Sequence, residues 1–551
     1  MIKSNEKTGI NQAKGKKKRG DAAVIKTDIK VSVKYSTEEI KSALLARLPL
    51  KEDEVQNLHI VRRALNVKAK DNIHYDLTVA LDLSEERERS LLNIRKKVRP
   101  HSEAELQIPA SKLLERPLVI GAGPAGLFAA LTLAISGGRP IVIERGGSVD
   151  EREVAVNRFN TFGVLDGECN IQFGEGGAGT FSDGKLKYGA PDRYKMFVLR
   201  EFVSAGADED ICYSVGAHLG TDKLKTIVKK IREKIISLGG EFRFNTRFDR
   251  PIIKDGRAVG AHLIPKNGDP YELYSDKIIL AIGHSARDTF RALRTVGIKM
   301  TPRPFGIGLR VEHPREYINE LVYGKGYPRE LGTASYHLVT HLNSGRSVYS
   351  FCMCPGGEVV AATGNEGSVV TNGMSEYSRM AENSNAAYLV SVSPEDFESD
   401  DPLAGFLLQE KIERRAFTLG GEDYRAPVTR MEEFLKNKAP QTLGSTRPSY
   451  KRGTKIAAPE EYLPAFVTDS LREAMYNFDA WMPGILYPDS PMTGPETRTT
   501  SPVRIDRNES FISESLDGIY PVGEGAGYAG GIVSSARDGV MAAISILEEN
   551  Q

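Results

Sequence analysis

Hydrophobic residues follow three successive patterns in residues 118–145. Leu118–Ile120 is an uninterrupted apolar run, as expected for a strand buried on both faces. In PAGLFAALTLAIS the apolar residues recur at helical spacing, and Gly137 and Gly138 end that pattern. PIVIER is a second buried run. This order predicts a strand–helix–strand unit with two parallel strands.

The pattern is different before residue 106. Residues 1–23 are polar and lysine-rich without periodicity, so we expect a disordered tail. From residue 24 the pattern predicts a strand, a helix, two strands and a second helix. The S-x-x-E sequence of Ser36–Glu39 predicts the start of the first helix. Residues 24–105 are therefore interpreted as a small α+β module without evident catalytic residues.

Composition limits the possible classes of function. The chain has 551 residues, which is enough for about three or four domains. Its formal net charge of +1 gives no overall attraction for nucleic acid or membranes, and no apolar run reaches about 18 residues. The four cysteines are too few for a disulfide scaffold, and the polar start of the sequence carries no apolar leader. We therefore expect a cytoplasmic protein.

The loop after the first of these strands carries the sequence GAGPAG, residues 121–126. Gly121 allows a tight turn, Gly123 lets a pyrophosphate approach the backbone, and Gly126 lets helix and strand pack closely. Glu144 ends the second strand, where its carboxylate can accept hydrogen bonds from both hydroxyls of a ribose. These features predict a dinucleotide site and fit both FAD and NAD.

The C-terminal segment distinguishes these two cofactors. It reads as a strand over residues 518–522, a glycine-rich turn, and a helix from about Ile532. This resembles the closing motif of glutathione-reductase-like flavoproteins, in which an acidic residue holds the flavin ribitol and the next helix points its N-terminus at the flavin ring. The resemblance implies FAD, with Glu524 where the family more often has aspartate. The strand ending at Ala281 and Gly283 resembles the family's A-x-G strand.

A second glycine-rich stretch, FGEGGAGT at residues 173–180, follows Glu144 after a predicted helix. It is interpreted as a flavin-contacting loop, with a flexible lid as the alternative. Lys185 is either a cation near the flavin edge or an ordinary surface lysine. The predicted FAD-binding residues are Gly121, Gly123, Pro124, Ala125, Gly126, Glu144, Arg145, Gly174, Gly176, Gly177, Gly179, Thr180, Ala281, Gly283, Gly523, Glu524, Gly530, Gly531 and Ile532.

A predicted hairpin carries two of the cysteines. Leu338–Leu342 and Val348–Cys354 are strands on either side of a turn, and alternation places Cys352 and Cys354 on one face. The two thiols are interpreted as small core residues, as a redox pair near the flavin, or as metal ligands. Since no second cysteine pair completes a tetrahedral site, we expect no metal. The hypothesis favours Cys354 over Cys352 because it adjoins a glycine turn.

The segment PMTGPETRTTSPVRI, residues 491–505, is expected to form loops and short strands. Glu496, Arg498 and Arg504 lie in it, shortly before the closing motif. They are either residues that bind an anionic substrate or solvated loop residues.

These motifs together resemble a bacterial family of uncharacterised FAD-dependent dehydrogenases of the glutathione-reductase-like superfamily. Disulfide reductases of this superfamily carry a second G-x-G-x-x-G for NADPH in the inserted region and a C-x-x-C or C-x4-C pair after the first strand–helix–strand unit, and this sequence has neither at those places. The resemblance implies an α/β fold in which an FAD-binding Rossmann-type domain is interleaved with an α+β substrate domain, which forms a roof over the flavin. The predicted FAD domain comprises residues 106–190, 215–300 and 505–551, and the predicted roof comprises residues 191–214 and 301–504.

Three hypotheses for function follow. The first is an FAD-dependent oxidoreductase that transfers a hydride between flavin N5 and an unidentified, anionic small molecule, with an electron carrier as a further partner. The second is an RNA-modifying or RNA-associated flavoprotein, suggested by the basic tail and the small module but disfavoured by the near-neutral charge. The third is a redox-sensing flavoprotein without turnover. The sequence does not determine the oligomeric state.

Overall fold

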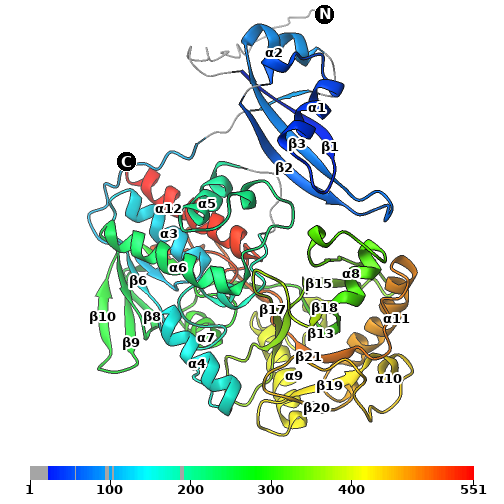
Figure 1. Cartoon of the computed structure of the whole chain (residues 1–551). Coiled ribbons are helices and arrows are strands. Elements are labelled where there is room, and N and C mark those ends of the chain that lie inside the picture. The colour runs from blue at the N-terminus through cyan, green and yellow to red at the C-terminus, as the bar shows by residue number, and fades with distance from the viewer. Residues whose placement is uncertain (1–22, 56, 94–97, 102–104, 187–191) are drawn as a thin grey trace, which may run out of the picture. The chain divides into compact units, whose positions relative to one another are not determined.

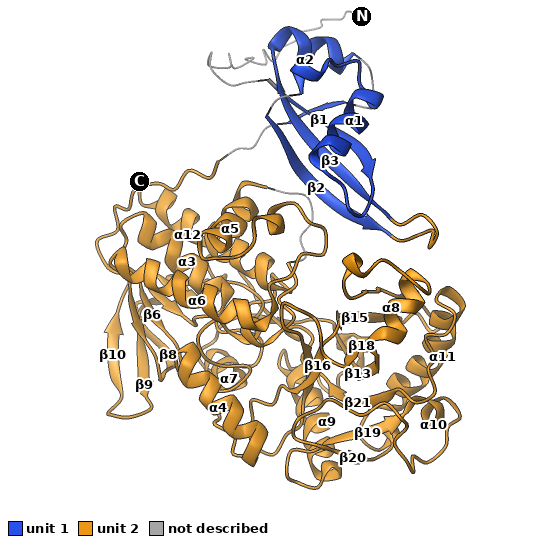
Figure 2. Ribbon diagram, viewed as in Figure 1, with its two compact units in different colours: residues 1–66, 74–103 blue, residues 67–73, 104–551 orange. Residues whose placement is uncertain are grey.

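The computed structural model describes residues 23–55, 57–93, 98–101, 105–186 and 192–551. The chain divides into two compact units, residues 1–66 with 74–103, and residues 67–73 with 104–551 (Figure 2). The predicted tail, residues 1–23, lies outside the described residues except for Ala23.

The first unit is an antiparallel sheet with two helices, in the strand order β2-β3-β1-β4. Ser36 caps the first helix by accepting a hydrogen bond from the Glu39 amide at 3.2 Å, as its motif predicts. Leu44, Leu77 and Leu81 are fully or almost fully buried in its core. The elements are β1 (Ala23–Val31), α1 (Thr37–Arg47), β2 (Leu58–Asn66), β3 (His74–Leu83), α2 (Glu85–Leu92) and β4 (Arg99–Pro100).

A five-stranded parallel sheet organises one half of the second unit (Figure 1). Its order is β23-β11-β5-β6-β7, and four of its strands are buried throughout. Burial on both faces explains why uninterrupted apolar runs form these strands. The strands are β5 (Leu118–Ile120), β6 (Ile141–Ile143), β7 (Glu241–Arg243), β11 (Ile278–Leu280) and β23 (Ile519–Pro521).

Different elements cover the two faces of this sheet. Four helices share a core cluster with one face: α3 (Pro124–Ile135), α5 (Arg193–Ser204), α6 (Gly220–Ser237) and α12 (Ile532–Glu549). The other face packs against a three-stranded antiparallel meander and α7: β8 (Thr246–Lys254), β9 (Arg257–Pro265), β10 (Tyr271–Tyr274) and α7 (Arg287–Thr295). Helix α4 (Val149–Phe162) follows β6.

Helix α5 corrects the predicted domain assignment. Residues 191–214 were expected in the roof, but Val198, Leu199 and Phe202 are buried in the cluster that contains α3 and α12. The ring of Phe202 lies edge-on to that of Phe128 at 5.3 Å. The apolar face of α5 predicts burial but does not specify the sheet against which the helix packs.

A seven-stranded sheet, called the roof sheet here, organises the other half in the order β14-β15-β18-β13-β21-β19-β20. Strands β14 and β15 form the predicted hairpin. The strands are β13 (Phe305–Pro314), β14 (Val339–His341), β15 (Ser347–Cys354), β18 (Asn383–Val392), β19 (Ala426–Arg430), β20 (Thr454–Ile456) and β21 (Pro491–Glu496). Nearby helices are α8 (Arg315–Tyr323), α9 (Ala404–Gly420), α10 (Met431–Leu435) and α11 (Ala465–Trp481).

Two small antiparallel pairs complete the unit: β12 (Met300–Pro302) with β22 (Val503–Ile505), and β16 (Glu358–Ala361) with β17 (Thr371–Met374). A cavity is lined by residues that follow the carboxyl ends of β5, β6, β11 and β23 and by residues of the roof sheet. Ligands of open parallel sheets bind at this edge.

Candidate functional site

Close backbone packing shapes the first glycine loop. Gly121 has a φ of +103°, and a Cβ there would lie 2.3 Å from the carbonyl oxygen of Ala281. A Cβ on Gly126 would lie 1.9 Å from the carbonyl oxygen of Gly121. Only glycine fits either position without moving the main chain. Gly126 therefore has the packing role that its motif predicts.

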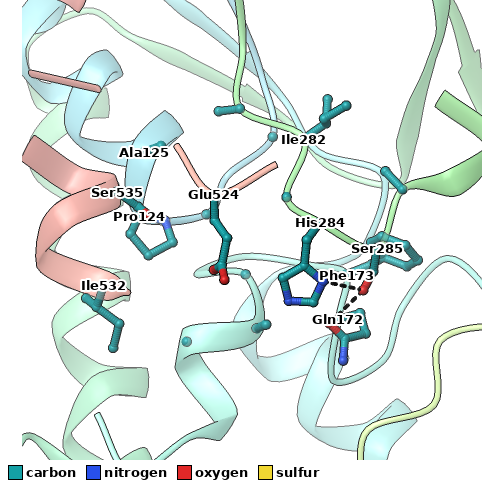
Figure 3. Close-up of a pocket in the computed structure, with 18 of the residues that line it drawn as sticks. Pro124, Ala125, Gln172, Phe173, Ile282, His284, Ser285, Glu524, Ile532 and Ser535 are labelled. Atoms are coloured by element: carbon teal, nitrogen blue, oxygen red, sulfur yellow. Dashed lines mark hydrogen bonds between the residues drawn. The ribbon is translucent and has the colours of Figure 1, made fainter. Parts of the chain in front are cut away.

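Gly123 has a different environment. It is the N-cap of α3, it offers no side-chain cap, and the nearest atom to an added Cβ would be the Gly177 Cα at 3.8 Å. Pro124 and Ala125 continue the helix into the cavity wall (Figure 3). The first amides of a helix have no partner within it and favour anions. This corner can accept a phosphate.

The second glycine loop is joined to the first. The amide of Gly176 donates to the carbonyl of Ala122 at 2.8 Å, and Gly174, Gly176 and Gly177 all have positive φ. A Cβ on Gly176 would lie 2.0 Å from the Thr180 hydroxyl. Gly176 and Thr180 therefore shape the loop from behind the cavity wall.

Glu144 organises three backbone segments. Its carboxylate accepts hydrogen bonds from the amides of Ala122 at 2.8 Å and of Gly146 and Gly174 at 2.9 Å. The side chain is buried and also lines the cavity. Since a carboxylate has about four acceptor positions, one position remains for a ligand hydroxyl. Its contact with a ribose stays a prediction.

Arg145, the next residue, is held by charge and by an aromatic ring. It pairs with Glu168 at 2.7 Å and with Asp288 at 2.9 Å, and its guanidinium lies 4.2 Å from the ring centre of Phe173. Although burial opposes the charge, the bonds to Glu168 and Asp288 raise the pKa of Arg145. It lines the cavity as a permanent, already paired cation.

The closing motif supplies a carboxyl group and a second helix N-terminus. Glu524 lines the cavity, and burial raises its pKa to about 7 despite the nearby Arg303. Gly531 caps α12 without a side-chain bond, and Ile532 begins the helix at the cavity wall (Figure 3). Gly523 lies behind this wall, where its amide donates to Asp538 at 2.7 Å.

The cavity brings together most of the predicted site residues. It is lined by Gly121, Gly123, Pro124, Ala125, Glu144, Arg145, Gly174, Gly177, Gly179, Lys185, Ala281, Gly283, Cys352, Glu496, Arg498, Glu524, Gly530, Gly531 and Ile532. The predicted residues outside its lining are Gly126, Gly176, Thr180, Cys354, Arg504 and Gly523.

The three predicted substrate residues have different environments. Glu496 is buried in an ion pair with Arg310, and Arg498 is buried in an ion pair with Glu413 at 2.7 Å. Arg504 is exposed on β22, with its guanidinium 5.3 Å from the ring centre of Tyr528. The solvated-loop interpretation is therefore wrong for Glu496 and Arg498. The sequence does not reveal their partners, which come from distant elements.

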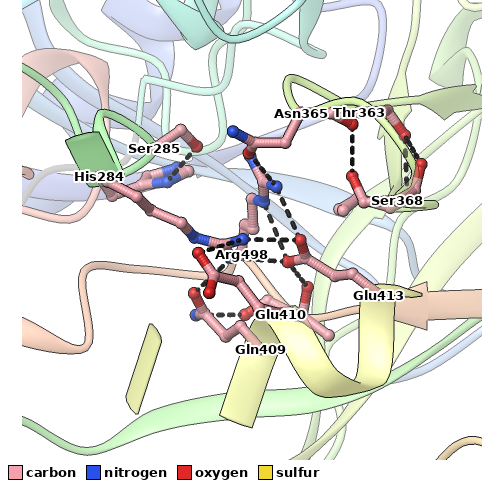
Figure 4. Close-up of polar contacts among 12 residues, drawn as sticks. His284, Ser285, Thr363, Asn365, Ser368, Gln409, Glu410, Glu413 and Arg498 are labelled. Atoms are coloured by element: carbon pink, nitrogen blue, oxygen red, sulfur yellow. Dashed lines mark hydrogen bonds and ion pairs between the residues drawn. The ribbon is translucent and has the colours of Figure 1, made fainter. Parts of the chain in front are cut away.

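Arg498 belongs to a buried network (Figure 4). Glu413 accepts from Arg287 at 2.8 and 2.9 Å, from Arg498 at 2.7 and 3.0 Å, and from the Thr497 hydroxyl at 2.7 Å. Burial alone would raise the pKa of Glu413, but Arg287 and Arg498 lower it to about 2. Among the described residues, Nη1 of Arg498 has no hydrogen-bond partner. The arginine can therefore still donate to a ligand.

His284 and Ser285 are cavity residues that the sequence analysis missed. The Ser285 hydroxyl lies 3.0 Å from His284 Nδ1 and 3.0 Å from the Gln172 amide oxygen (Figure 3). Burial, with the charges of Arg498 and Arg287, lowers the pKa of His284 to about 4. The imidazole is therefore neutral at physiological pH. The position of His284 and Ser285 directly after the A-x-G strand is the sequence feature that could have indicated them as cavity residues.

The cysteines differ from the expected arrangement. Cys352 lines the cavity, whereas Cys354 is fully buried and does not. The pairing of β15 with β18 shifts register between Ser350 and Met353, which interrupts the alternation assumed for this strand. The preference for Cys354 as the cavity thiol is wrong. Lys185 also lines the cavity, and its Nζ donates to the Met353 carbonyl.

The cavity fits a dinucleotide. It combines two helix N-termini without side-chain caps and a glycine-lined corner, where a Cβ on Gly123 would meet no atom closer than the Gly177 Cα at 3.8 Å. Arg498 is one of its lining residues, and its buried Nη1 has no hydrogen-bond partner among the described residues. Together with the parallel sheet, these features define a dinucleotide-binding α/β protein.

Comparisons with known proteins identify the family. Residues 304–499 match the family described as FAD-dependent protein, C-terminal domain-like. An uncharacterized protein of Clostridium beijerinckii is 41% identical over 528 residues, which cover 95% of this chain and 98% of that protein. The chain belongs to this family of FAD-dependent proteins, and its cofactor is FAD.

Solved flavoproteins show only a weak likeness. The FAD complex of glycerol-3-phosphate dehydrogenase from Bacillus halodurans is 11% identical, with 80% of this chain and 65% of that chain covered and a TM-score of 0.35. A flavoprotein/dehydrogenase from Cytophaga hutchinsonii is 13% identical, with 79% and 80% covered and a TM-score of 0.35. These values support no statement about mechanism. Within the described part of the chain, no helix combines the length and apolar character needed to cross a membrane.

Proposed function

We propose that the protein is an FAD-dependent oxidoreductase that transfers a hydride between flavin N5 and a small anionic molecule, with that substrate or an electron carrier as its partner. The observation that carries this proposal is the composition of one cavity. Its lining includes both glycine loops and helix N-termini on one side and charged residues of the roof region on the other. A cofactor and a polar substrate would therefore bind against different parts of the cavity lining.

The glycine-loop side provides the groups that would hold FAD. The amides at the start of α3, next to Gly123, would bind the phosphates, and the start of α12 at Ile532 provides a second positive helix end. Glu524 would contact the ribitol. When bound, FAD supplies a two-electron hydride acceptor or donor.

The other side would bind and orient the substrate. Glu413 holds Arg498 in position, and the buried Nη1 of Arg498, which has no partner among the described residues, would donate to a substrate carboxylate. From the parallel-sheet side, neutral His284 follows β11 and can hold a proton at a ring nitrogen, and its ring is positioned by Ser285.

Anaerobic flavin absorbance tests the proposal. The FAD-bound protein is mixed with carboxylate metabolites and with both nicotinamides, and bleaching of the flavin identifies a reductant. We expect Arg498→Lys to raise the KM of an anionic substrate by about tenfold, because lysine lacks the planar second donor. Arg504→Lys is the matched control, since Arg504 lies outside the cavity. An unchanged KM for Arg498→Lys would contradict the substrate site. Slow reduction by NAD(P)H is expected, because the described residues form one parallel sheet with a dinucleotide-binding glycine loop and no second one.

A further inference from the structure

A serine hydroxyl lies between the His284 ring and a side-chain amide. The Ser285 hydroxyl is 3.0 Å from His284 Nδ1 and 3.0 Å from the Gln172 amide oxygen (Figure 3). Ser285 and Gln172 are both buried. A hydroxyl has a single proton, so it can donate to only one of these two neighbours. The orientation of the Gln172 amide determines which of them receives the proton.

The Ala362 carbonyl fixes that orientation. Gln172 Nε2 lies 2.9 Å from the Ala362 carbonyl oxygen. Because a carbonyl oxygen only accepts hydrogen bonds, the NH₂ group of Gln172 must face Ala362 and the amide oxygen must face Ser285. The amide oxygen also only accepts, so the Ser285 hydroxyl donates to Gln172. His284 Nδ1 therefore carries a proton and donates it to the Ser285 oxygen.

The other ring nitrogen of His284 is consequently without a proton. The ring is neutral at physiological pH, because its pKa is lowered to about 4, chiefly by burial, and a neutral imidazole carries one N–H only. His284 is half-buried and lines the cavity, and Nε2 has no hydrogen-bond partner among the described residues. The cavity therefore contains a nitrogen lone pair that can accept a proton and cannot donate one.

Two buried guanidiniums act on this ring. Arg287 and Arg498 share the carboxylate of Glu413, at 2.8 and 2.7 Å (Figure 4). After burial, the charges of Arg498 and Arg287 lower the pKa of His284, whereas the charge of Glu413 raises it. A substrate carboxylate bound near Arg498 would act on the ring in the same direction as Glu413. The ring would then become a stronger proton acceptor when an anionic ligand is present.

We propose that the substrate is a small hydroxy acid, that Nε2 of His284 accepts the proton of its hydroxyl group, and that Arg498 attracts its carboxylate. This inference rests on the proposed hydride transfer. The carbon-bound hydrogen leaves with its electron pair for flavin N5, the O–H electron pair forms the second bond of a carbonyl group, and the hydroxyl proton moves to Nε2. The products are an oxo acid, FAD reduced by two electrons, and protonated His284, which releases the proton to solvent.

The protonation state of each ring nitrogen is measurable without catalysis. The protein is labelled with ¹⁵N-histidine, and long-range ¹H–¹⁵N NMR correlations at about pH 7 distinguish protonated from bare ring nitrogens, in FAD-free and FAD-bound protein. We expect a protonated Nδ1 and a bare Nε2 for His284, whose signals are identified by their loss in His284→Gln. A protonated Nε2 overturns the proposal, whether or not any metabolite reduces the flavin.

His313 provides an internal control with the opposite tautomer. Its Nε2 lies 2.9 Å from the Ile485 carbonyl oxygen, so Nε2 must be the protonated nitrogen. Ser285→Ala tests the cause of the His284 tautomer. Without the hydroxyl, Nδ1 loses its acceptor, and the His284 signals should move toward the average of the two tautomers while those of His313 stay unchanged. A His284 tautomer that is unaffected by Ser285→Ala contradicts the role of the Ser285–Gln172 pair.

Glycolate, the smallest hydroxy acid, tests the substrate class by binding alone. Its Kd and that of acetate, which lacks the hydroxyl, are measured from the perturbation of flavin absorbance. We expect glycolate to bind about fivefold more tightly, because its hydroxyl gains one hydrogen bond to Nε2. His284→Phe should bind both equally, whereas His284→Gln keeps an acceptor oxygen and should retain the preference. Equal Kd values in the wild type overturn the hydroxy-acid assignment. A bare Nε2 and a preference for glycolate, without flavin reduction by any hydroxy acid, would contradict hydride transfer and leave the proton acceptor in place.

Discussion

The glycine-loop side of the cavity presents mainly backbone, whereas the roof side presents charged side chains. On the first side, positions such as Gly121 and Gly126 allow main-chain segments to approach within distances that a Cβ would prevent. On the second, Arg310 pairs with Glu496, and Glu413 with two arginines, inside the protein. Backbone donors keep their dipoles at any pH, but ion pairs do not keep their charges.

Because of this difference, substitutions on the two sides of the cavity are expected to affect the protein in different ways. A side chain added on the glycine-loop side occupies space. It either blocks ligand binding alone or, where main-chain segments are in contact, destabilises the fold. A residue removed from the roof side leaves a buried partner charge, which costs free energy even when the shape is preserved. Four substitutions, two of them with a matched comparison variant, test this division.

The largest effect is expected from Gly126→Val. Its Cβ would lie 1.9 Å from the Gly121 carbonyl oxygen, so β5 and α3 must separate. We expect a loss of more than about 3 kcal/mol in the free energy of unfolding, measured with urea. Gly123→Val has room for its Cβ and is expected to fold normally but to lack FAD, as measured by flavin absorbance per protein. Equal destabilisation by both substitutions would contradict the distinction between a packing glycine and a ligand glycine.

Glu413→Gln tests the roof side. The substitution keeps the volume but leaves Arg287 and Arg498 buried without their carboxylate, at an expected cost of about 3 to 5 kcal/mol. Because the pKa of Glu413 is lowered to about 2, its contribution is complete above the ordinary value of 4.5 and is lost only as the pH falls through about 2. The difference from wild type in urea unfolding should therefore be constant between about pH 6 and 8. Glu410→Gln, at a more exposed neighbour, should cost less than about 1 kcal/mol.

The same division explains what the sequence could predict. The glycines at 121, 123 and 126 and the strand–helix–strand unit around them are contiguous in sequence, so their spacing predicts the turn and the helix N-terminus. Arg310 and Glu496 are 186 residues apart, and no local pattern indicates that they pair. The preference for Cys354 over Cys352 failed for a related reason, because which of the two residues lines the cavity depends on how β15 pairs with β18, where the register shifts.

Glu312→Gln has a smaller and pH-dependent expected effect. Burial raises the pKa of Glu312 to about 7, although Ser449 and Asn383 donate hydrogen bonds to it. A raised pKa gives stability that is present below the ordinary value of 4.5 and is lost as the pH rises through about 7. Glutamine does not ionise, and its side-chain oxygen can still accept the hydrogen bonds from Ser449 and Asn383. Between about pH 5 and 8, the wild type should lose about 1 to 3 kcal/mol relative to the variant in urea unfolding. A difference that stays constant across this range would contradict burial as the cause.

Glu524→Gln sharpens the comparison most finely, because Glu524 is an ionisable group on the glycine-loop side. Because its pKa is about 7, Glu524 is partly protonated near physiological pH. The negative charge of a bound pyrophosphate would repel the carboxylate and so favour the protonated form further. FAD binding should therefore take up a fraction of a proton, and the Kd for FAD should rise by about three- to tenfold between about pH 6 and 8. Glutamine removes this carboxylate and should give a Kd that varies by less than about twofold over the same range. Titration of the apoprotein with FAD, followed by quenching of flavin fluorescence, measures both. If the Kd for FAD depends on pH in the same way in wild type and variant, the pH dependence comes from another group, and Glu524 contributes only through its shape.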